Sequence, residues 1–160
     1  MIESILQRFI TAVQTHDSPG LSQLFTNDGV YDDYFFGRHS GRAEIAAMLD
    51  RFHVGGEAFC WQFHDLLEQG DLAYASYLFS YRSLEPESQG EIIVFEGMAK
   101  IRLLDGLMTH YAEVFDRGIA FSQLGYPSER IGKLLSRYAK GFVASEPVIG
   151  HLAHRKTVIG

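Results

Sequence analysis

Apolar residues near the start of the chain recur at steps of three and four, the period of one helix face. This stripe predicts an amphipathic helix and consists of Ile2, Ile5, Leu6, Phe9, Ile10 and Val13. A short second helix is expected next, because Ser18 can cap its start and Pro19 suits its first position. Residues 42–52 repeat the helical spacing and end before Gly55 and Gly56, so they predict a third helix.

Residues 57–117 lack the helical period and are rich in aromatic residues, which predicts strands. The expected strands are 57–68, 72–83, 91–104 and 107–117, with an earlier strand at 30–36 followed by a loop at 37–41. The breaks between the four long strands are short and rich in turn residues, so they indicate antiparallel hairpins.

A last amphipathic helix is predicted at 128–138, with Ile131, Leu134, Leu135 and Tyr138 on one face. Residues 142–160 show no period, so we expect a partly ordered tail after a domain that spans residues 1–141. Helices followed by antiparallel strands are typical of an α+β fold, in which helices cover one face of the sheet.

Composition narrows the possible functions. The chain has 160 residues with a net charge of −6, which argues against a nucleic-acid partner. Its single cysteine, Cys60, excludes an intramolecular disulfide and favours a cytoplasmic location. No apolar stretch approaches the roughly 18 residues of a membrane span, so we expect no membrane partner.

The order of the predicted elements resembles the SnoaL-like branch of the nuclear transport factor 2-like superfamily, relatives of ketosteroid isomerases, polyketide cyclases and scytalone dehydratases. The motifs that carry the resemblance lie at residues 25–31, 40–45, 68–73 and 110–116. The resemblance implies a curved antiparallel sheet that forms a cone over three N-terminal helices and an apolar cavity, with an added C-terminal helix. It also implies a homodimer through the sheet.

Asp33 is the first candidate catalytic residue. In the ketosteroid isomerase pattern, the segment that resembles residues 27–33 ends in the general base, and burial would raise the pKa of such a carboxylate toward working pH. The remaining isomerase site is incomplete, because Phe9 stands where that pattern has a tyrosine. The strand acid of that pattern falls near Met98, two residues from Glu96. The alternative interpretation is that Asp33 is a solvated residue at the mouth of a strand.

Two histidines and a second aspartate complete the candidate catalytic set. Strict alternation places Met108, His110, Ala112, Val114 and Asp116 on one strand face. The resemblance to scytalone dehydratases adds His64 and the pair Asp33 and Tyr34. The hydrolase triad of related epoxide hydrolases is absent, since Ala112 replaces its arginine. Each histidine could instead be a structural residue, and Asp116 could cap the strand.

The sequence therefore predicts a pocket for a small apolar, aromatic or polycyclic ligand. The expected catalytic residues are Asp33, His64, His110 and Asp116, and the expected ligand-binding residues are Tyr34, Phe9, Trp61, Glu96 and Met98. An enzyme of this kind would be a cofactor-free isomerase, cyclase or dehydratase, and no metal site is expected because His151 and His154 lack a third ligand. The alternative is a non-catalytic binding or dimeric module that uses Tyr111 and Phe115 on an outer sheet face. Whether the segment from Phe142 covers the pocket or exchanges onto a partner stays open.

Overall fold

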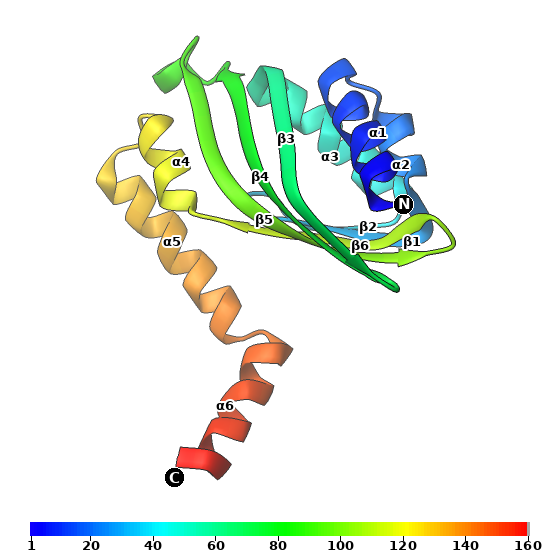
Figure 1. Cartoon of the computed structure of the whole chain (residues 1–160). Helices are drawn as coiled ribbons and strands as arrows, with labels where there is room; N and C mark the ends of the chain where they lie inside the picture. The colour runs from blue at the N-terminus through cyan, green and yellow to red at the C-terminus, as the bar shows by residue number, and fades with distance from the viewer. Residues whose placement is uncertain (160) are drawn as a thin grey trace. The chain divides into compact units, whose positions relative to one another are not determined.

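The computed structural model describes residues 1–159, which form a compact unit of Met1–Gly125 and a second unit that begins at Tyr126. The second unit begins before residue 141, the end of the domain predicted from the sequence. The first unit contains four α-helices and a curved six-stranded sheet, and Figure 1 shows the three N-terminal helices on the concave side of this sheet. The α+β cone expected from the sequence is thereby confirmed.

The three N-terminal helices are α1 (Ile2–Thr15), α2 (Ser18–Gln23) and α3 (Arg42–Gly55). The predicted stripe of α1 is buried except for Ile10, because it faces the sheet. Helix α1 ends at His16, whose φ of 57° turns the chain toward α2. The carboxylate of Asp17 then caps α2 by accepting a hydrogen bond from the Gly20 amide at 2.9 Å.

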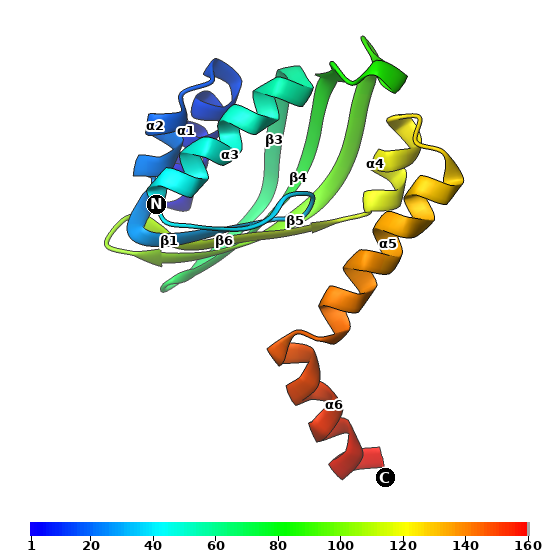
Figure 2. The same ribbon diagram turned by 180° about the vertical axis from the view of Figure 1, so that it is seen from behind.

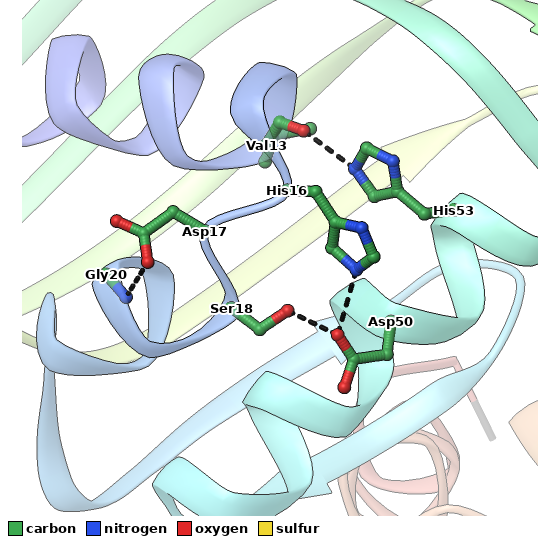
Figure 3. A network of polar contacts seen from close by, with 7 residues as sticks. All are labelled: Val13, His16, Asp17, Ser18, Gly20, Asp50 and His53. Carbon is green, nitrogen blue, oxygen red and sulfur yellow. Dashed lines mark hydrogen bonds and ion pairs between the residues drawn. The ribbon is translucent and has the colours of Figure 1, made fainter.

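A polar network ties the ends of these helices together (Figure 3). Asp50 of α3 accepts hydrogen bonds from His16 at 2.9 Å and from the Ser18 hydroxyl at 2.6 Å. His53 donates to the Val13 carbonyl at 2.9 Å, and its ring stacks on that of His16 with 3.9 Å between centroids. The network therefore fixes α3 to the turn between α1 and α2.

The sheet has the strand order β2-β1-β6-β5-β4-β3. Its strands are β1 (Phe25–Asp33), β2 (Gly37–Ser40), β3 (Gly56–Gln69), β4 (Leu72–Ser83), β5 (Ile92–Leu104) and β6 (Leu107–Phe115). A 3-10 turn, η1 (Pro86–Ser88), connects β4 to β5. The four long strands form the predicted antiparallel meander, and Figures 1 and 2 show it curving around the helices.

The sheet departs from the prediction in two places. Residues 37–40, expected as a loop, form strand β2 antiparallel to β1. Strand β1 starts at Phe25 and runs parallel to β6, so the sheet is mixed and not wholly antiparallel. Both differences arise because long-range pairing decides the structure of a segment whose glycine-rich composition favours turns.

A short helix that the sequence did not reveal follows β6. This helix, α4 (Arg117–Gln123), is capped by Asp116, whose carboxylate accepts from the amides of Gly118 and Ile119. Gln123 makes two hydrogen bonds to the backbone of Val94, which attach the end of α4 to β5. Phe121 is buried and its ring contacts Phe35 at 5.5 Å between centroids.

The second unit consists of α5 (Ser128–Val143) and α6 (Glu146–Ile159). The predicted helix at 128–138 is thus present and longer, and a helix also occupies the segment predicted to be a partly ordered tail. Neither helix contains a buried residue. Among the described residues, no helix is long and apolar enough to cross a membrane.

Candidate functional site

The interior of the first unit is lined by aromatic side chains from α1 and five strands. Phe9 of α1 lies at their centre, where it stacks on Tyr111 at 5.2 Å and meets the edge of Trp61 at 5.0 Å. Tyr31 contacts Tyr111 at 4.6 Å, and Tyr77 contacts Trp61 at 5.4 Å. These rings form a rigid apolar environment in which any polar group must find a protein partner or a ligand.

Two carboxyl groups are buried among these rings. Asp33 ends β1 and is 6% exposed, and Glu113 lies in β6 and is 7% exposed. The two carboxyl groups lie close enough for each to influence the pKa of the other. The hydroxyls of Tyr77 and Tyr111 donate to Glu113 at 3.0 and 3.3 Å. Buried acids are rare unless paired, so this cluster is the leading candidate site.

The parallel pairing of β1 and β6 brings the two carboxyl groups together. Tyr31 is opposite Tyr111 and the next pair is Asp32 with Ala112, so one further step places Asp33 beside Glu113. Because successive side chains alternate between faces, Tyr31 and Asp33 face the interior and Asp32 faces outward. Tyr77 reaches the pair from β4, across β5.

The turn after Asp33 holds its carboxylate in place. The amides of Phe35 and Phe36 donate to Asp33 at 2.8 and 2.6 Å. Arg117 of α4 donates to the Tyr34 carbonyl at 2.5 Å, and its guanidinium lies 3.5 Å from the centroid of the Tyr34 ring. The start of α4 therefore fixes the backbone that orients Asp33.

Burial dominates the electrostatics of the carboxyl pair. It raises the pKa of Asp33 to about 6, although the amides of Phe36 and Phe35, the hydrogen bond with Glu113 and the charge of Arg117 lower it. Burial, and then the charge of Asp33, raises the pKa of Glu113 well above its usual range. Two raised carboxyl groups in contact favour sharing one proton, and Glu113 keeps that proton more readily than Asp33 does.

The same burial keeps the neighbouring phenols protonated. Desolvation, followed by the charge of Glu113, raises the pKa of Tyr77 and Tyr111 above the ordinary value of a phenol. The indole Nε1 of Trp61 is buried without a hydrogen-bond partner among residues 1–159. One apolar interior thus holds two carboxyl groups with raised pKa values, together with several hydroxyl or N–H donors. Acid–base catalysis uses groups of these kinds.

Of the four predicted catalytic residues, the structure directs only Asp33 into this interior. His64 lies on the outer side of β3 and pairs with Asp65 at 2.8 Å. His110 points outward from β6 and meets Asp32 at 2.5 Å. Asp116 is exposed and caps α4. The expected convergence of the four side chains is therefore absent.

A β-bulge explains why strict alternation failed in β6. Leu103 of β5 pairs with Met108, but its neighbour Arg102 pairs with His110, so β6 holds one extra residue there. The bulge moves Tyr111 and Glu113 onto the same interior face as Met108. His110, expected on the face of Met108, consequently turns outward.

The predicted ligand-binding residues also divide between the two faces of the sheet. Phe9 and Trp61 are buried in the interior, and Tyr34 is half-buried in the turn after Asp33. Glu96 and Met98 lie on the outer face of β5, because Phe95 and Ala99 take the interior positions. A contact of Glu96 or Met98 with an interior ligand would require a different register.

Sequence reasoning missed Glu113, Tyr77 and Tyr111. The signal present in the sequence is the run Tyr111, Glu113 and Phe115 at two-residue steps, in which an acid occupies the middle of an aromatic strand face. Among residues 1–159, no group of three or more histidine, cysteine or acidic side chains could hold a metal ion.

Comparisons with known proteins agree with this architecture. A family model described as a SnoaL-like domain matches residues 6–111. No curated protein matches the sequence.

Solved structures share the fold at low sequence identity. A hypothetical protein with a ketosteroid isomerase-like fold from Catenulispora acidiphila, in complex with trimethylamine, is 18% identical over 78% of this chain and 95% of that chain, with a TM-score of 0.69. A candidate SnoaL-like polyketide cyclase from Shewanella denitrificans is 22% identical over 76% and 95%, with a TM-score of 0.66. An epoxide hydrolase resembling limonene epoxide hydrolase, from M. tuberculosis, is 20% identical over 76% and 86%, with a TM-score of 0.62.

Proposed function

Since the chain belongs to the SnoaL-like domain family, we propose that it is a cofactor-independent acid–base enzyme acting on a small apolar organic substrate. The observation that carries this proposal is the burial of Asp33 and Glu113 in one aromatic interior, where the hydroxyls of Tyr77 and Tyr111 donate to Glu113. An isomerase, a cyclase and a dehydratase all need a base and an acid of this kind within one apolar interior.

In the proposed reaction, Asp33 removes a proton from a carbon next to a carbonyl group of the substrate. Negative charge then develops on the carbonyl oxygen, where the Glu113 carboxylic acid donates a hydrogen bond. Return of the proton from Asp33 to another carbon completes an isomerisation, and loss of a hydroxide with that proton completes a dehydration. The phenols of Tyr77 and Tyr111 hold Glu113 in position.

The lining suggests a flat substrate. Phe9, Trp61 and Phe63 offer ring faces and edges, which favours aromatic or polycyclic compounds. The Trp61 indole N–H supplies a donor at a distance from the carboxyl pair along the sheet. Asp33 keeps the role that the sequence predicts for it, and we assign the acid role to Glu113 in place of His64, His110 and Asp116.

Exchange of carbon-bound hydrogen tests this proposal without knowledge of the natural substrate. The wild-type protein should accelerate deuterium incorporation next to the carbonyl of 2-tetralone in D2O, followed by NMR. Asp33→Asn should reduce the rate by about 100-fold or more, because it removes the base. The matched control is Asp32→Asn, the adjacent carboxylate on the outer face, which should leave the rate unchanged. Equal rates in the Asp33 variant and the wild type would refute the proposed base.

A non-catalytic binding protein is the second candidate function. It is favoured by the departures from known catalytic sets, such as Phe9 in the place of a tyrosine. If the protein only binds its ligand, 2-tetralone should raise the melting temperature of the protein without incorporating deuterium. The Asp33→Asn variant should show the same stabilisation by 2-tetralone.

We further propose a homodimer that uses the outer face of the sheet. The apolar residues Leu78, Val94, Met98 and Val114, here called the outer patch, are exposed on β4, β5 and β6. Tyr111 and Phe115, expected in this interface, face the interior because of the bulge in β6. A solution mass of twice 18.0 kDa would support the dimer, and a monomer at 100 µM (about 2 mg/mL) would refute it.

A cytoplasmic location is also part of the proposal. Its support is the one cysteine, Cys60, which is a free and exposed thiol. Recovery of the native protein in the cytosolic fraction tests it.

A further inference from the structure

Trp61 carries a buried hydrogen-bond donor that the proposed reaction does not use. The residue is 5% exposed, and its indole Nε1 has no hydrogen-bond partner among residues 1–159. A buried N–H without an acceptor costs free energy, whereas a phenylalanine would fill the same apolar space without that cost. The unpaired indole therefore indicates an acceptor that the described part of the chain does not provide.

The rings that contact the indole leave it in an apolar environment. Their centroids lie 4.7 to 5.5 Å from that of the indole, and they belong to Phe9, Phe63, Tyr77 and Phe79. The polar atom on these rings is the Tyr77 hydroxyl, which already donates to Glu113 at 3.0 Å. A ligand oxygen beside the indole would pair the N–H in a medium of low dielectric constant, where hydrogen bonds are strong.

The indole and the carboxyl pair lie on the same interior face, with Tyr77 between them. The ring of Tyr77 contacts Trp61 at 5.4 Å, and the hydroxyl at its other end reaches Glu113. Strand β3, which holds Trp61, lies three strands from β6, or roughly 14 Å between axes at about 4.8 Å per step. A substrate that contacts both groups is therefore longer than one ring.

We propose that the indole N–H of Trp61 donates a hydrogen bond to a second oxygen atom of the substrate, at the end opposite the carbonyl group that reacts. This inference rests on the proposed function and narrows its substrate to ketones of two or more rings with an oxygen at each end. The second oxygen belongs to a neutral hydroxyl, ether or carbonyl group. No lysine or arginine among residues 1–159 is buried, so an anionic group beside the indole would lack a buried counter-charge.

A role in packing alone is the competing explanation for the same indole. The planes of Trp61 and Tyr77 meet at 61°, an arrangement in which an N–H can lie over a ring face. Such a contact is weak, and it would make the protein indifferent to a second oxygen on its ligand. The two explanations therefore differ in one measurable quantity, the preference for a ketone that carries the distal oxygen.

The test compares 2-tetralone with 6-hydroxy-2-tetralone, whose hydroxyl lies at the end of the skeleton opposite the carbonyl. The measured quantity is kcat/KM for deuterium incorporation in D2O, and the ratio of altered to wild-type protein for each ketone cancels the difference in acidity between the two ketones. Trp61 is the single tryptophan of the chain, so replacing tryptophan by 3-benzothienylalanine changes this position alone. That replacement exchanges the N–H for sulfur and keeps the shape of the ring, and Trp61→Phe is the second variant.

Both changes should lower the preference for 6-hydroxy-2-tetralone over 2-tetralone by about tenfold, because the hydroxylated ketone alone offers the indole an acceptor. The matched control is Phe79→Leu, which alters the packing beside Trp61 and removes no donor. It should change kcat/KM for the two ketones by the same factor. Circular dichroism shows that each protein keeps its fold, and the benzothienylalanine protein decides the matter if Trp61→Phe does not.

The outcomes separate this inference from the proposed function. An unchanged preference in the altered proteins would refute the hydrogen bond and leave the proposed function intact. If the wild type incorporates deuterium into neither ketone, the proposed function is refuted, and binding decides the role of Trp61. The melting temperature of the wild type should then rise more with 6-hydroxy-2-tetralone than with 2-tetralone, and the benzothienylalanine protein should lose that difference. Equal shifts with the two ketones in the wild type would refute the hydrogen bond.

Discussion

At the scale of single residues, the carboxyl pair has an energetic consequence for the whole fold. The pKa of Asp33 rises from its ordinary value of 3.8 to about 6 on folding. The folded state therefore binds this proton more tightly than the unfolded state, so its stabilising effect is complete below about pH 4 and is lost as the pH rises through about 6. A shift of this size corresponds to roughly 3 kcal/mol.

Replacing Asp33 by asparagine should remove this dependence. Asp33→Asn keeps an oxygen that accepts from the amides of Phe35 and Phe36, but it needs no proton. We expect the variant to be more stable than the wild type at pH 8, by about 1–3 kcal/mol, and to lose this advantage at pH 4. Urea unfolding at the two pH values measures the difference. A variant less stable than the wild type at pH 8 would contradict the raised pKa.

His53 should act in the opposite direction. Burial and then the charge of His16 lower its pKa, although the Val13 carbonyl and Asp50 raise it. The unfolded state binds this proton more tightly, so stability falls as the pH drops below about 6.5. His53→Gln, which can still donate to Val13, should lose less stability than the wild type between pH 7 and pH 5 in urea unfolding. His64→Gln, on the outer face, should match the wild type.

Asp116 is expected to be structural. Asp116→Ala removes the cap of α4 and should lower the free energy of unfolding by about 1 kcal/mol, because two amides lose their acceptor. Asp116→Asn should restore most of this loss, since asparagine is also a good cap. Both variants should catalyse deuterium incorporation into 2-tetralone at the wild-type rate. If Asp116→Asn incorporated deuterium into 2-tetralone much more slowly than the wild type, Asp116 would be a catalytic residue after all.

At the scale of elements, the sequence predicts what local period and turn chemistry determine. The amphipathic stripes located α1, α3 and α5, and the short turns located the meander. Period could not locate α6 or the strand β2, since α6 lacks a single apolar face and β2 depends on pairing with β1. The sequence could not predict the site, because the site depends on a bulge in β6. One extra residue near Thr109 decides whether Glu113 or His110 faces the interior, and the residue pattern alone does not reveal it.

Gly97 of β5 is required by the packing of Tyr77 next to it. A methyl group at this position would lie 2.4 Å from the Tyr77 hydroxyl and 2.7 Å from the Val114 carbonyl. Gly97→Ala should therefore cost about 1–3 kcal/mol and displace Tyr77 from Glu113. The control is Gly141→Ala in α5, where nothing lies within 4 Å, and it should raise stability slightly. Thermal unfolding compares the two, and an unchanged melting temperature in Gly97→Ala would contradict the contact.

At the scale of the whole molecule, the proposed homodimer should depend on the outer patch. Met98→Glu places a charge among the exposed apolar side chains of this patch and should raise the dimer dissociation constant at least tenfold. The control is Gln89→Glu in the exposed turn before β5, which should leave the constant unchanged. Sedimentation velocity measures both variants, and a dimer that Met98→Glu leaves as strong as the wild type would contradict an interface on this face.

The parallel pairing of β1 with β6 bears on how the chain folds. Tyr31 and Tyr111 are partners although 80 residues separate them. A growing chain cannot place β1 in the sheet until β6 has left the ribosome, and contacts this distant in sequence slow folding. The edge of β1 that β6 later covers stays open in the meantime and can pair with other chains. Uptake of a proton by the carboxyl pair, which comes together only when these two strands meet, would therefore report the pairing of β1 with β6.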